Sequence, residues 1–444
     1  MKLSDHFTIK KLLKYTAPTI AMMVFTSVYG VVDGFFVSNF AGKMSFTALN
    51  FIMPVVLMLS ATGFLFGTGG CALLSKYMGE GQADKANQIF TQNTVSSLIV
   101  GVVLAIAGYF FMPFMSGLLG AEGELLTKSV LYGRILMISL PLFVIQTEFQ
   151  TLFPAAEKAH LGFYVTVAAG VLNMILDALF CGVFKWGLVG AASATVISEC
   201  TGGGLSLLYF ASRYNTSRLR FTGFEFDLSA LFKVLTNGSS ELMSNISMSL
   251  VGMLFNVQLL KYAGSNGVAA YGVIMYVNFV FVSMFIGYSV GSAPLISYNL
   301  GADNKEEMSG IFRKSLLIIA CGAVLMFTIA KLFGGGIASI FVGYDEELLR
   351  VTKNAFSIYS FAFLFSGFSI YASSFFTALN DGLTSALISF LRLLVFEALS
   401  LLILPLIFGV NGIWSSIILA EFLSVTSASC FVVAKRKNTD IKRY

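Results

Sequence analysis

The sequence predicts an all-α membrane protein with twelve transmembrane helices in two six-helix lobes. Its composition, the spacing of its apolar segments and an internal repeat each point to this fold. Of its 444 residues, 57% are hydrophobic and only 11% are charged. Soluble domains carry about 25% charged residues, because their surfaces face water. We therefore expect much of the surface of this protein to face lipid.

Long apolar stretches recur along the whole chain and are separated by short polar breaks. A helix needs roughly 20 apolar residues to cross the hydrocarbon core of a bilayer. A β-barrel would instead show alternating segments of about ten residues. The predicted spans of the first half lie near 15–40, 48–75, 90–116, 130–153, 161–184 and 188–212. Those of the second half lie near 236–262, 270–297, 311–334, 355–379, 384–407 and 412–434.

The distribution of basic residues predicts the orientation. An even number of spans puts both termini on one side. If that side is the cytoplasm, the termini and inner loops carry more than twice as many Lys and Arg residues as the outer loops, in agreement with the positive-inside rule. The net charge of +5 then reflects topology, and we expect no nucleic-acid partner. The short loops and the lack of an evident signal peptide favour a prokaryotic plasma (inner) membrane.

The two halves of the chain resemble each other at a constant offset. Residues 75–90 align with 297–312, and residues 187–199 align with 409–421, without a gap. Because each half holds an even number of spans, both halves enter the membrane in the same orientation. The repeat is therefore parallel and predicts a pseudo-twofold axis along the membrane normal. In such architectures the substrate site lies between the halves.

The repeat predicts the domain boundaries. We expect a six-helix lobe, a basic cytoplasmic linker, a second six-helix lobe and a basic cytoplasmic tail. These segments are 1–212, 213–235, 236–434 and 435–444. One chain already contains both lobes, so we expect a monomer to be functional.

The first half carries ionisable residues inside predicted spans, where they cost several kcal/mol unless they face a cavity or a partner. Asp33 lies in the first span and Asp177 in the fifth, with Asn173 four residues earlier on the same helix face. Thr195 in the sixth span could add a hydroxyl. Such oxygens coordinate hard cations such as Na⁺, and a buried carboxylate can carry H⁺. We predict an ion-coupling site here.

The matching positions of the second half lack this chemistry. They hold the apolar residues Phe255, Val395 and Leu399. A purely structural role would more readily be shared by both halves, so the asymmetry favours a functional site. The alternative is a buried hydrogen-bonded pair that holds helices together.

The second half has polar candidates of its own. Glu241 and Asn245 lie in an unusually polar stretch of the seventh span, which suggests a water-accessible cavity. They are candidates for contact with a substrate or a proton. Arg392 and Glu397 lie in the eleventh span, and we favour a structural pair between them.

Three further glutamates lie inside predicted spans. Glu199 and Glu421 occupy equivalent positions in the repeat, and this symmetry favours a structural role. The role of Glu148 in the fourth span stays open.

Signatures of soluble enzymes and metal sites are missing from the sequence. There is no Walker-type phosphate loop, no HExxH and no GxSxG. The five cysteines show no paired spacing, and the two histidines lie far apart in the chain. We therefore expect no enzyme activity, no cofactor and no bound metal other than a coupling ion. Energy would come from a gradient of H⁺ or Na⁺.

Several segments resemble the multidrug and toxic compound extrusion (MATE) family, in its prokaryotic DNA-damage-inducible-like branch. They occur in family order over essentially the whole chain. These segments are VDGFFVSNFAG (32–42), LLSKYMGEGQADKA (73–86), LNMILDALF (172–180), WGLVGAASATVISE (186–199), PLISYNLGADNKEE (294–307) and LPLIFGVNGIWSS (404–416).

The resemblance implies two lobes around a V-shaped cavity and secondary active efflux of organic, mostly cationic and lipophilic compounds in exchange for H⁺ or Na⁺. It also implies an ion site in the first lobe, whose family positions fall on Asp33, Asn173, Asp177 and Thr195. The stretch 153–159 departs from the family pattern, because it lacks an arginine that many members carry there. This difference bears on the cytoplasmic gate or on the range of substrates.

Two other classes of function remain as alternatives. A lipid-linked oligosaccharide flippase of the same superfamily usually has extra spans and several cationic cavity residues, whereas Arg392 is the one clearly intramembrane cation here. A membrane-embedded enzyme should show clustered metal ligands or histidines, and a receptor would not need a twofold repeat. The sequence leaves the coupling ion and the substrate open.

Overall fold

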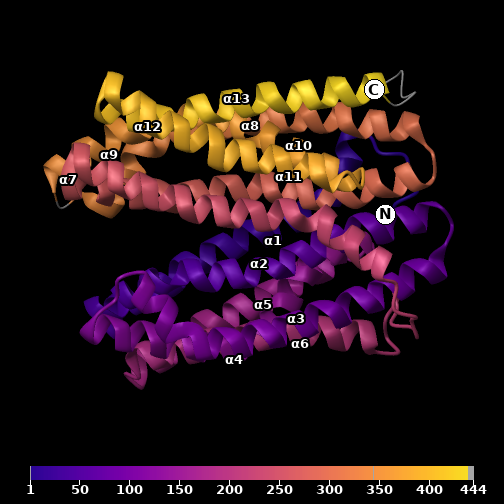
Figure 1. Ribbon diagram of the computed structural model, residues 1–444, viewed down its shortest axis with the longest axis horizontal. Coiled ribbons are helices and arrows are strands. Elements are labelled where there is room, and N and C mark those ends of the chain that lie inside the picture. Colours follow the sequence, from indigo (N-terminus) through magenta and orange to yellow (C-terminus); the bar gives the residue numbers. More distant parts are fainter. Residues whose placement is uncertain (1, 344, 439–444) are drawn as a thin grey trace.

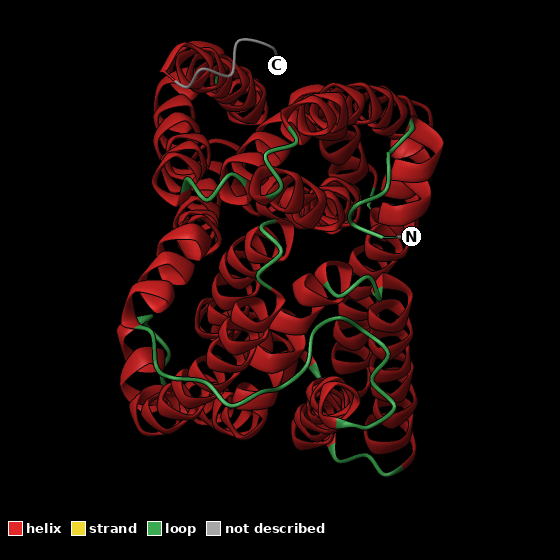
Figure 2. Ribbon diagram, turned by 90° about the vertical axis from the view of Figure 1, so that its right-hand side faces the viewer, coloured by secondary structure: helices red, strands yellow, loops and turns green. Residues whose placement is uncertain are grey.

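The computed structural model describes residues 2–343 and 345–438, and these residues are almost entirely helical. The N-terminal half forms one helical bundle and the C-terminal half forms a second bundle beside it (Figure 1). The two bundles are also distinct when they are viewed from the end that holds both termini (Figure 2). The predicted all-α fold with two lobes is confirmed.

The N-terminal lobe holds six long helices, and short π-helical turns follow the first and the fifth. The elements are α1 (Ile9–Phe36), η1 (Val37–Ala41), α2 (Lys43–Gly79), α3 (Ala83–Leu118), α4 (Gly123–Ala155), α5 (Ala159–Asp177), η2 (Ala178–Val183) and α6 (Gly187–Ala211).

The C-terminal lobe repeats this plan with more interruptions. Its elements are α7 (Leu228–Gly301), α8 (Lys305–Val342), α9 (Glu346–Tyr359), η3 (Ser360–Ala362), α10 (Phe363–Ala378), α11 (Gly382–Phe390), η4 (Leu391–Phe396), α12 (Glu397–Phe408) and α13 (Val410–Asn438). In this lobe α9 and α10 form one span, and α11 and α12 form another.

Within the described residues, ten helices are long and apolar enough to cross a membrane. One of them, α7, has 74 residues, and its backbone leaves the helical region at Gly264. Both ends of α7 pack against the same end of α2, through Val234 and Tyr298, so α7 contains two antiparallel spans. The helix α6, with 25 residues, completes the twelve spans.

The outer surface is apolar, as a lipid-facing surface must be. On α3, four large side chains are 61–70% exposed, namely Phe110, Phe111, Phe114 and Leu118. A contiguous apolar surface of this kind would drive aggregation in water, whereas it is well solvated by lipid tails. The protein is therefore a multi-pass membrane protein.

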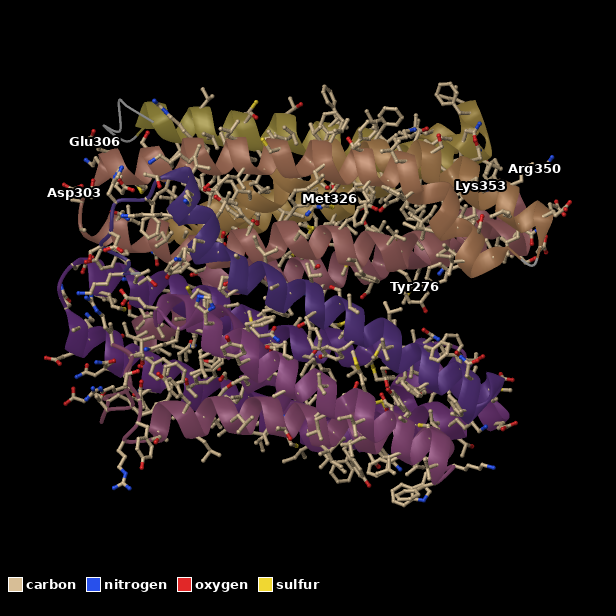
Figure 3. The ribbon with its side chains drawn as sticks, turned by 180° about the vertical axis from the view of Figure 1, so that it is seen from behind. Tyr276, Asp303, Glu306, Met326, Arg350 and Lys353 are labelled. Carbon is tan, nitrogen blue, oxygen red and sulfur yellow. The ribbon has the colours of Figure 1, made fainter. Side chains whose placement is uncertain are left out.

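The two lobes meet along α2 and α7, near the end of the molecule where both termini lie (Figure 1). Glycines allow this close approach. A Cβ at Gly79 would overlap the carbonyl oxygen of Tyr298, and a Cβ at Gly301 would overlap that of Lys76. Toward the opposite end, which carries Arg350 and Lys353, the lobes diverge (Figure 3).

The N-terminal residues pack against both lobes. Residues 2–8, here called the N-terminal strap, run across the end where the lobes meet. Leu3 and Phe7 are fully buried in the core of the C-terminal lobe. Helix α1 then begins at Ile9, earlier than predicted, and the Thr8 hydroxyl caps it.

The predicted linker and tail also need correction. Helix α7 already begins at Leu228, where the Asp227 carboxylate accepts a hydrogen bond from the Ala230 N–H at 3.0 Å. The last part of the predicted linker 213–235 is therefore helical. In the predicted tail 435–444, α13 continues to Asn438, and residues 439–444 lie outside the described part of the chain.

Candidate functional site

Asp33 and Asp177, predicted from sequence as part of an ion-coupling site, lie close together in the N-terminal lobe. Asp33 lies near the end of α1 and is 7% exposed, and Asp177 ends α5 and is fully buried. The two carboxyl groups interact electrostatically. Each helix continues into a π-helical turn, a local expansion that is frequent at functional sites.

The polar atoms around this pair are incompletely bonded. Among the described residues, neither oxygen of the Asp177 carboxyl group, nor Oδ1 of Asp33, nor the amide nitrogen of Asn173 has a hydrogen-bond partner. Buried polar groups are nearly always paired, so an unpaired group of this kind calls for an additional ligand. A bound cation, a proton or water would satisfy these oxygens.

The neighbouring residues on α4 and α6 extend this polar region. Thr195 is half-buried, and its hydroxyl donates to the Ala191 carbonyl at 3.1 Å. Glu199 accepts a hydrogen bond from the Ser139 hydroxyl at 2.5 Å. Tyr132 is fully buried and interacts electrostatically with Asp33, Asp177 and Glu199.

Tyr132 and Ser139 were not predicted from the sequence. Both lie on α4, seven residues apart and hence on one helix face. Isolated hydroxyl groups in an apolar span are too common to mark a site. The spacing becomes informative only once the packing of α4 against α6 is known.

The C-terminal lobe contains a cavity of about 270 Å³ that reaches the N-terminal lobe. Glu241 and Asn245 line it, as the polar stretch of the seventh span suggests. Side chains of α2, among them Phe64 and Thr68, close the cavity from the other lobe. A ligand in this cavity would therefore contact both lobes.

A cluster of hydroxyl groups also borders this cavity, between α10 and α11. Ser373 is hydrogen-bonded to Ser385 at 2.9 Å and to Ser389 at 2.8 Å, and Thr377 is hydrogen-bonded to Ser385 at 2.7 Å. Such groups can exchange donors and acceptors with a ligand without carrying charge.

The partner of Arg392 is Glu421, and the predicted Arg392–Glu397 pair is wrong. The Arg392 Nη2 lies 2.7 Å from Glu421 Oε1, and Nε lies 3.0 Å from both carboxylate oxygens. Glu397 lines the same cavity and is 8% exposed. The five-residue spacing of Arg392 and Glu397 is poor in an α-helix, but the π-helical turn η4 directs both side chains to the cavity.

Glu148, whose role the sequence leaves open, is fully buried within the N-terminal lobe. It accepts hydrogen bonds from Asn93 at 2.8 Å, from Thr94 at 3.3 Å and from Ser97. All three donors lie on α3, so Glu148 joins α3 to α4. Its satisfied hydrogen bonds indicate a structural role.

Comparison with known proteins identifies the family. A family model described as MatE matches residues 18–179 and 242–402, one segment in each lobe. The chain belongs to the MatE family. The predicted resemblance is confirmed, and the matched segments of this MatE transporter include Asp33, Asp177 and Arg392.

The relatives of this MatE transporter include two multidrug export proteins MepA. That of Staphylococcus saprophyticus is 24% identical, and the match covers 98% of this chain and 95% of the relative. That of Staphylococcus haemolyticus is 22% identical, and the match covers 98% of this chain and 95% of the relative.

Solved structures share the fold. A multidrug resistance MATE transporter of the MOP superfamily in an outward-facing conformation has a TM-score of 0.92, with 20% identity, over 99% of this chain and 98% of the other. A MOP superfamily transporter from Pyrococcus furiosus, described as having a binding pocket of reverse polarity, has a TM-score of 0.90, with 20% identity, over 99% and 98%.

Proposed function

We propose that this protein exports organic, mostly cationic and lipophilic compounds in exchange for H⁺ or Na⁺, by alternating access. The Asp33–Asp177 pair carries the proposal. Two carboxylates this close and this buried cannot both stay charged without compensation. A proton or Na⁺ neutralises them, with Asn173 and Thr195 as further oxygen ligands for Na⁺.

Coupling follows from where the pair lies. Neutralising Asp33 and Asp177 removes their repulsion and allows α1 and α5 to pack more closely. The π-helical turns η1 and η2, which contact each other, are the segments where such a change of packing is easiest. Because α1 also packs against α7 of the other lobe, occupancy of this site can bias the arrangement of the lobes.

A cationic substrate is supported by the charge of the cavity and by the relatives. The cavity is lined by Glu241, Glu397 and Glu421, whereas its guanidinium, Arg392, is already bound to Glu421. A phosphate of a lipid-linked sugar would lack a free cation in this cavity. The MepA relatives are described as multidrug export proteins.

The same proposal assigns each end of the molecule to one side of the membrane. Both termini lie at one end, together with Asp303 and Glu306, whereas Arg350 and Lys353 lie at the opposite end (Figure 3). With the termini in the cytoplasm of a prokaryote, the lobes meet on the cytoplasmic side and diverge outward. A monomer in the plasma membrane is sufficient for this cycle.

Transport by reconstituted protein tests the proposal. We would measure efflux of ethidium from proteoliposomes under separately imposed gradients of Na⁺ and H⁺, for the wild type and for Asp33→Asn and Asp177→Asn. We expect one gradient to drive efflux and each substitution to reduce gradient-driven efflux at least tenfold. Glu306→Gln, a change of the same kind at an exposed residue, is the control. Efflux that persists undiminished in both Asn variants would refute the site.

A further inference from the structure

Glu199 of α6 carries a charge that no neighbouring cation cancels. It is half-buried, and its carboxyl group accepts a hydrogen bond from the neutral Ser139 hydroxyl at 2.5 Å. Among the residues with described side chains, no lysine or arginine forms an ion pair with Glu199. A carboxylate inside the membrane costs several kcal/mol unless it has a partner or faces a cavity. A structural role as one half of an ion pair therefore does not account for Glu199.

The internal repeat shows that the missing counter-charge is specific to the N-terminal lobe. The equivalent of Glu199 in the second half is Glu421, which Arg392 binds at 2.7 Å. The equivalent of Arg392 in the first half is Gly170. A Cβ at Gly170 would lie 2.5 Å from the ring of Phe25, so the packing of α1 against α5 leaves no space for a cationic side chain. The two glutamates thus share a position but not a partner.

Glu199 shares its electrostatic environment with the Asp33–Asp177 pair. It interacts with Asp33, and the fully buried Tyr132 interacts with all three carboxyl groups. The other titratable groups that interact with Glu199 are those of Tyr29 on α1 and Cys200 on α6. All of these neighbours are acids, so none of them supplies a positive charge.

Unpaired polar atoms mark this region as one that takes a ligand. The hydroxyl oxygen of Tyr132 and both carboxyl oxygens of Asp177 are buried and have no hydrogen-bond partner in the described part of the chain. Such groups are nearly always paired in proteins. One proton or Na⁺ at the Asp33–Asp177 pair would leave the charge of Glu199 uncompensated, so a second cation is needed for this side chain.

We propose that Glu199 is a third ion-coupling carboxylate, and that the N-terminal lobe takes up two positive charges in each transport cycle. One charge is carried at the Asp33–Asp177 pair and the other at Glu199. This inference rests on the proposed antiport and adds its stoichiometry. Exchange of one monovalent organic cation for two H⁺ or Na⁺ moves one net positive charge across the membrane, whereas exchange for a single ion moves none.

The response of transport to a membrane potential tests this charge balance. Efflux of ethidium, a monovalent cation, would be measured from proteoliposomes under the gradient of the coupling ion. The same assay would be repeated with an inside-negative potential set by K⁺ and valinomycin. We expect this potential to accelerate efflux by the wild type about threefold or more, because net positive charge moves inward. The potential retains ethidium that leaks passively, so leakage cannot produce the acceleration.

Variants of Glu199 assign the second charge. Glu199→Gln should still show gradient-driven efflux but no acceleration by the potential, because only the Asp33–Asp177 pair then carries an ion. Glu199→Asp, which keeps the carboxylate, should retain the acceleration, and so should the exposed control Glu306→Gln. Melting temperatures would show that each variant is folded.

Three results would overturn the proposal. The first is efflux by the wild type that the potential does not accelerate. The second is wild-type acceleration in Glu199→Gln. The third is a folded Glu199→Gln without gradient-driven efflux, since Glu199 would then be part of the pair and not the carrier of a separate charge. Failure of the proposed function is distinct, because Asp33→Asn would then retain gradient-driven efflux or the wild type would show none.

Discussion

Glu199 and Glu421 occupy the same position in the two halves, but they have different partners. Glu199 accepts a hydrogen bond from a neutral hydroxyl, that of Ser139, whereas Glu421 binds the guanidinium of Arg392. Because the Ser139 hydroxyl is neutral, it does not cancel the negative charge of Glu199. The guanidinium instead cancels the charge of Glu421, and it interacts electrostatically with Glu397 as well.

Glu421→Gln tests whether Glu421 positions Arg392. Without the carboxylate, we expect Arg392 to pair with Glu397, because the π-helical turn η4 directs both to the cavity. Ethidium, a cation, should then bind more weakly to the full-length protein in lipid nanodiscs, because this pairing neutralises a carboxylate that lines the cavity. Glu421→Asp, which keeps the carboxylate, should restore at least part of the affinity for ethidium. Wild-type affinity for ethidium in folded Glu421→Gln would show that Glu421 has no such role.

Some of these residues could be predicted from the sequence, and others could not. Asp33 and Asp177 are charged residues in long apolar runs, and Asn173 lies one helical turn from Asp177. The local sequence was therefore enough to predict these three residues as candidates for a site. Arg392 and Glu421 are 29 residues apart in the sequence and lie on two consecutive spans. No local pattern reveals which of several glutamates packs against an arginine, since this depends on how α11–α12 and α13 pack together.

Among the elements, the π-helical turns and the N-terminal strap are the features that the sequence did not predict. A π-helical turn has no strong sequence signature, because it arises where tertiary packing stretches a helix. In the strap, only Leu3 and Phe7 are buried, and they stand among polar and basic residues. Two apolar residues are too few to show the periodic pattern by which a buried segment is recognised in a sequence. The twelve spans, in contrast, are long and apolar and could be placed from hydropathy alone.

An ion pair joins the end of α13 to the start of α11. Lys435 Nζ lies 2.5 Å from Asp381 Oδ2 in the loop before α11. Partial burial alone would raise the pKa of Asp381, but the hydrogen bonds from Lys435 and Thr384 outweigh this effect and hold the pKa below its usual value. The charged form of Asp381 is therefore favoured by folding.

This lowered pKa predicts how stability depends on pH. A carboxyl group with a depressed pKa stabilises the fold above its unfolded pKa, and this contribution is lost as the pH falls through the folded pKa. Asp381→Asn should therefore melt at a lower temperature than the wild type near pH 7. The difference should shrink as the pH falls below 3.8, the usual value. Melting curves of both proteins and of Glu306→Gln from pH 7 to pH 3 would check this, and a difference that does not change with pH would contradict it.

On the scale of the whole molecule, the N-terminal strap connects the two lobes at the end where they meet. The Leu3 N–H donates to Glu157 of the N-terminal lobe at 2.8 Å, and the Phe7 N–H donates to Glu307 of the C-terminal lobe at 2.8 Å. Lys314 donates to the Phe7 carbonyl at 2.6 Å. If the lobes separated at this end, the strap would lose either its hydrogen bond to Glu157 or its hydrogen bonds to Glu307 and Lys314.

The combined change Glu157→Gln and Glu307→Gln should therefore weaken the closed arrangement at this end. Each substitution replaces a charge-assisted hydrogen bond by a weaker neutral one. Spin labels at the exposed positions 84 and 303, one in each lobe, would report the separation by double electron–electron resonance, with the native cysteines replaced by serine. We expect a larger population at long distances than in the unsubstituted background. The control is Glu306→Gln, which removes the same charge from the neighbouring residue and leaves the strap bonded. Identical distance distributions in all three proteins would show that the strap does not hold the lobes together.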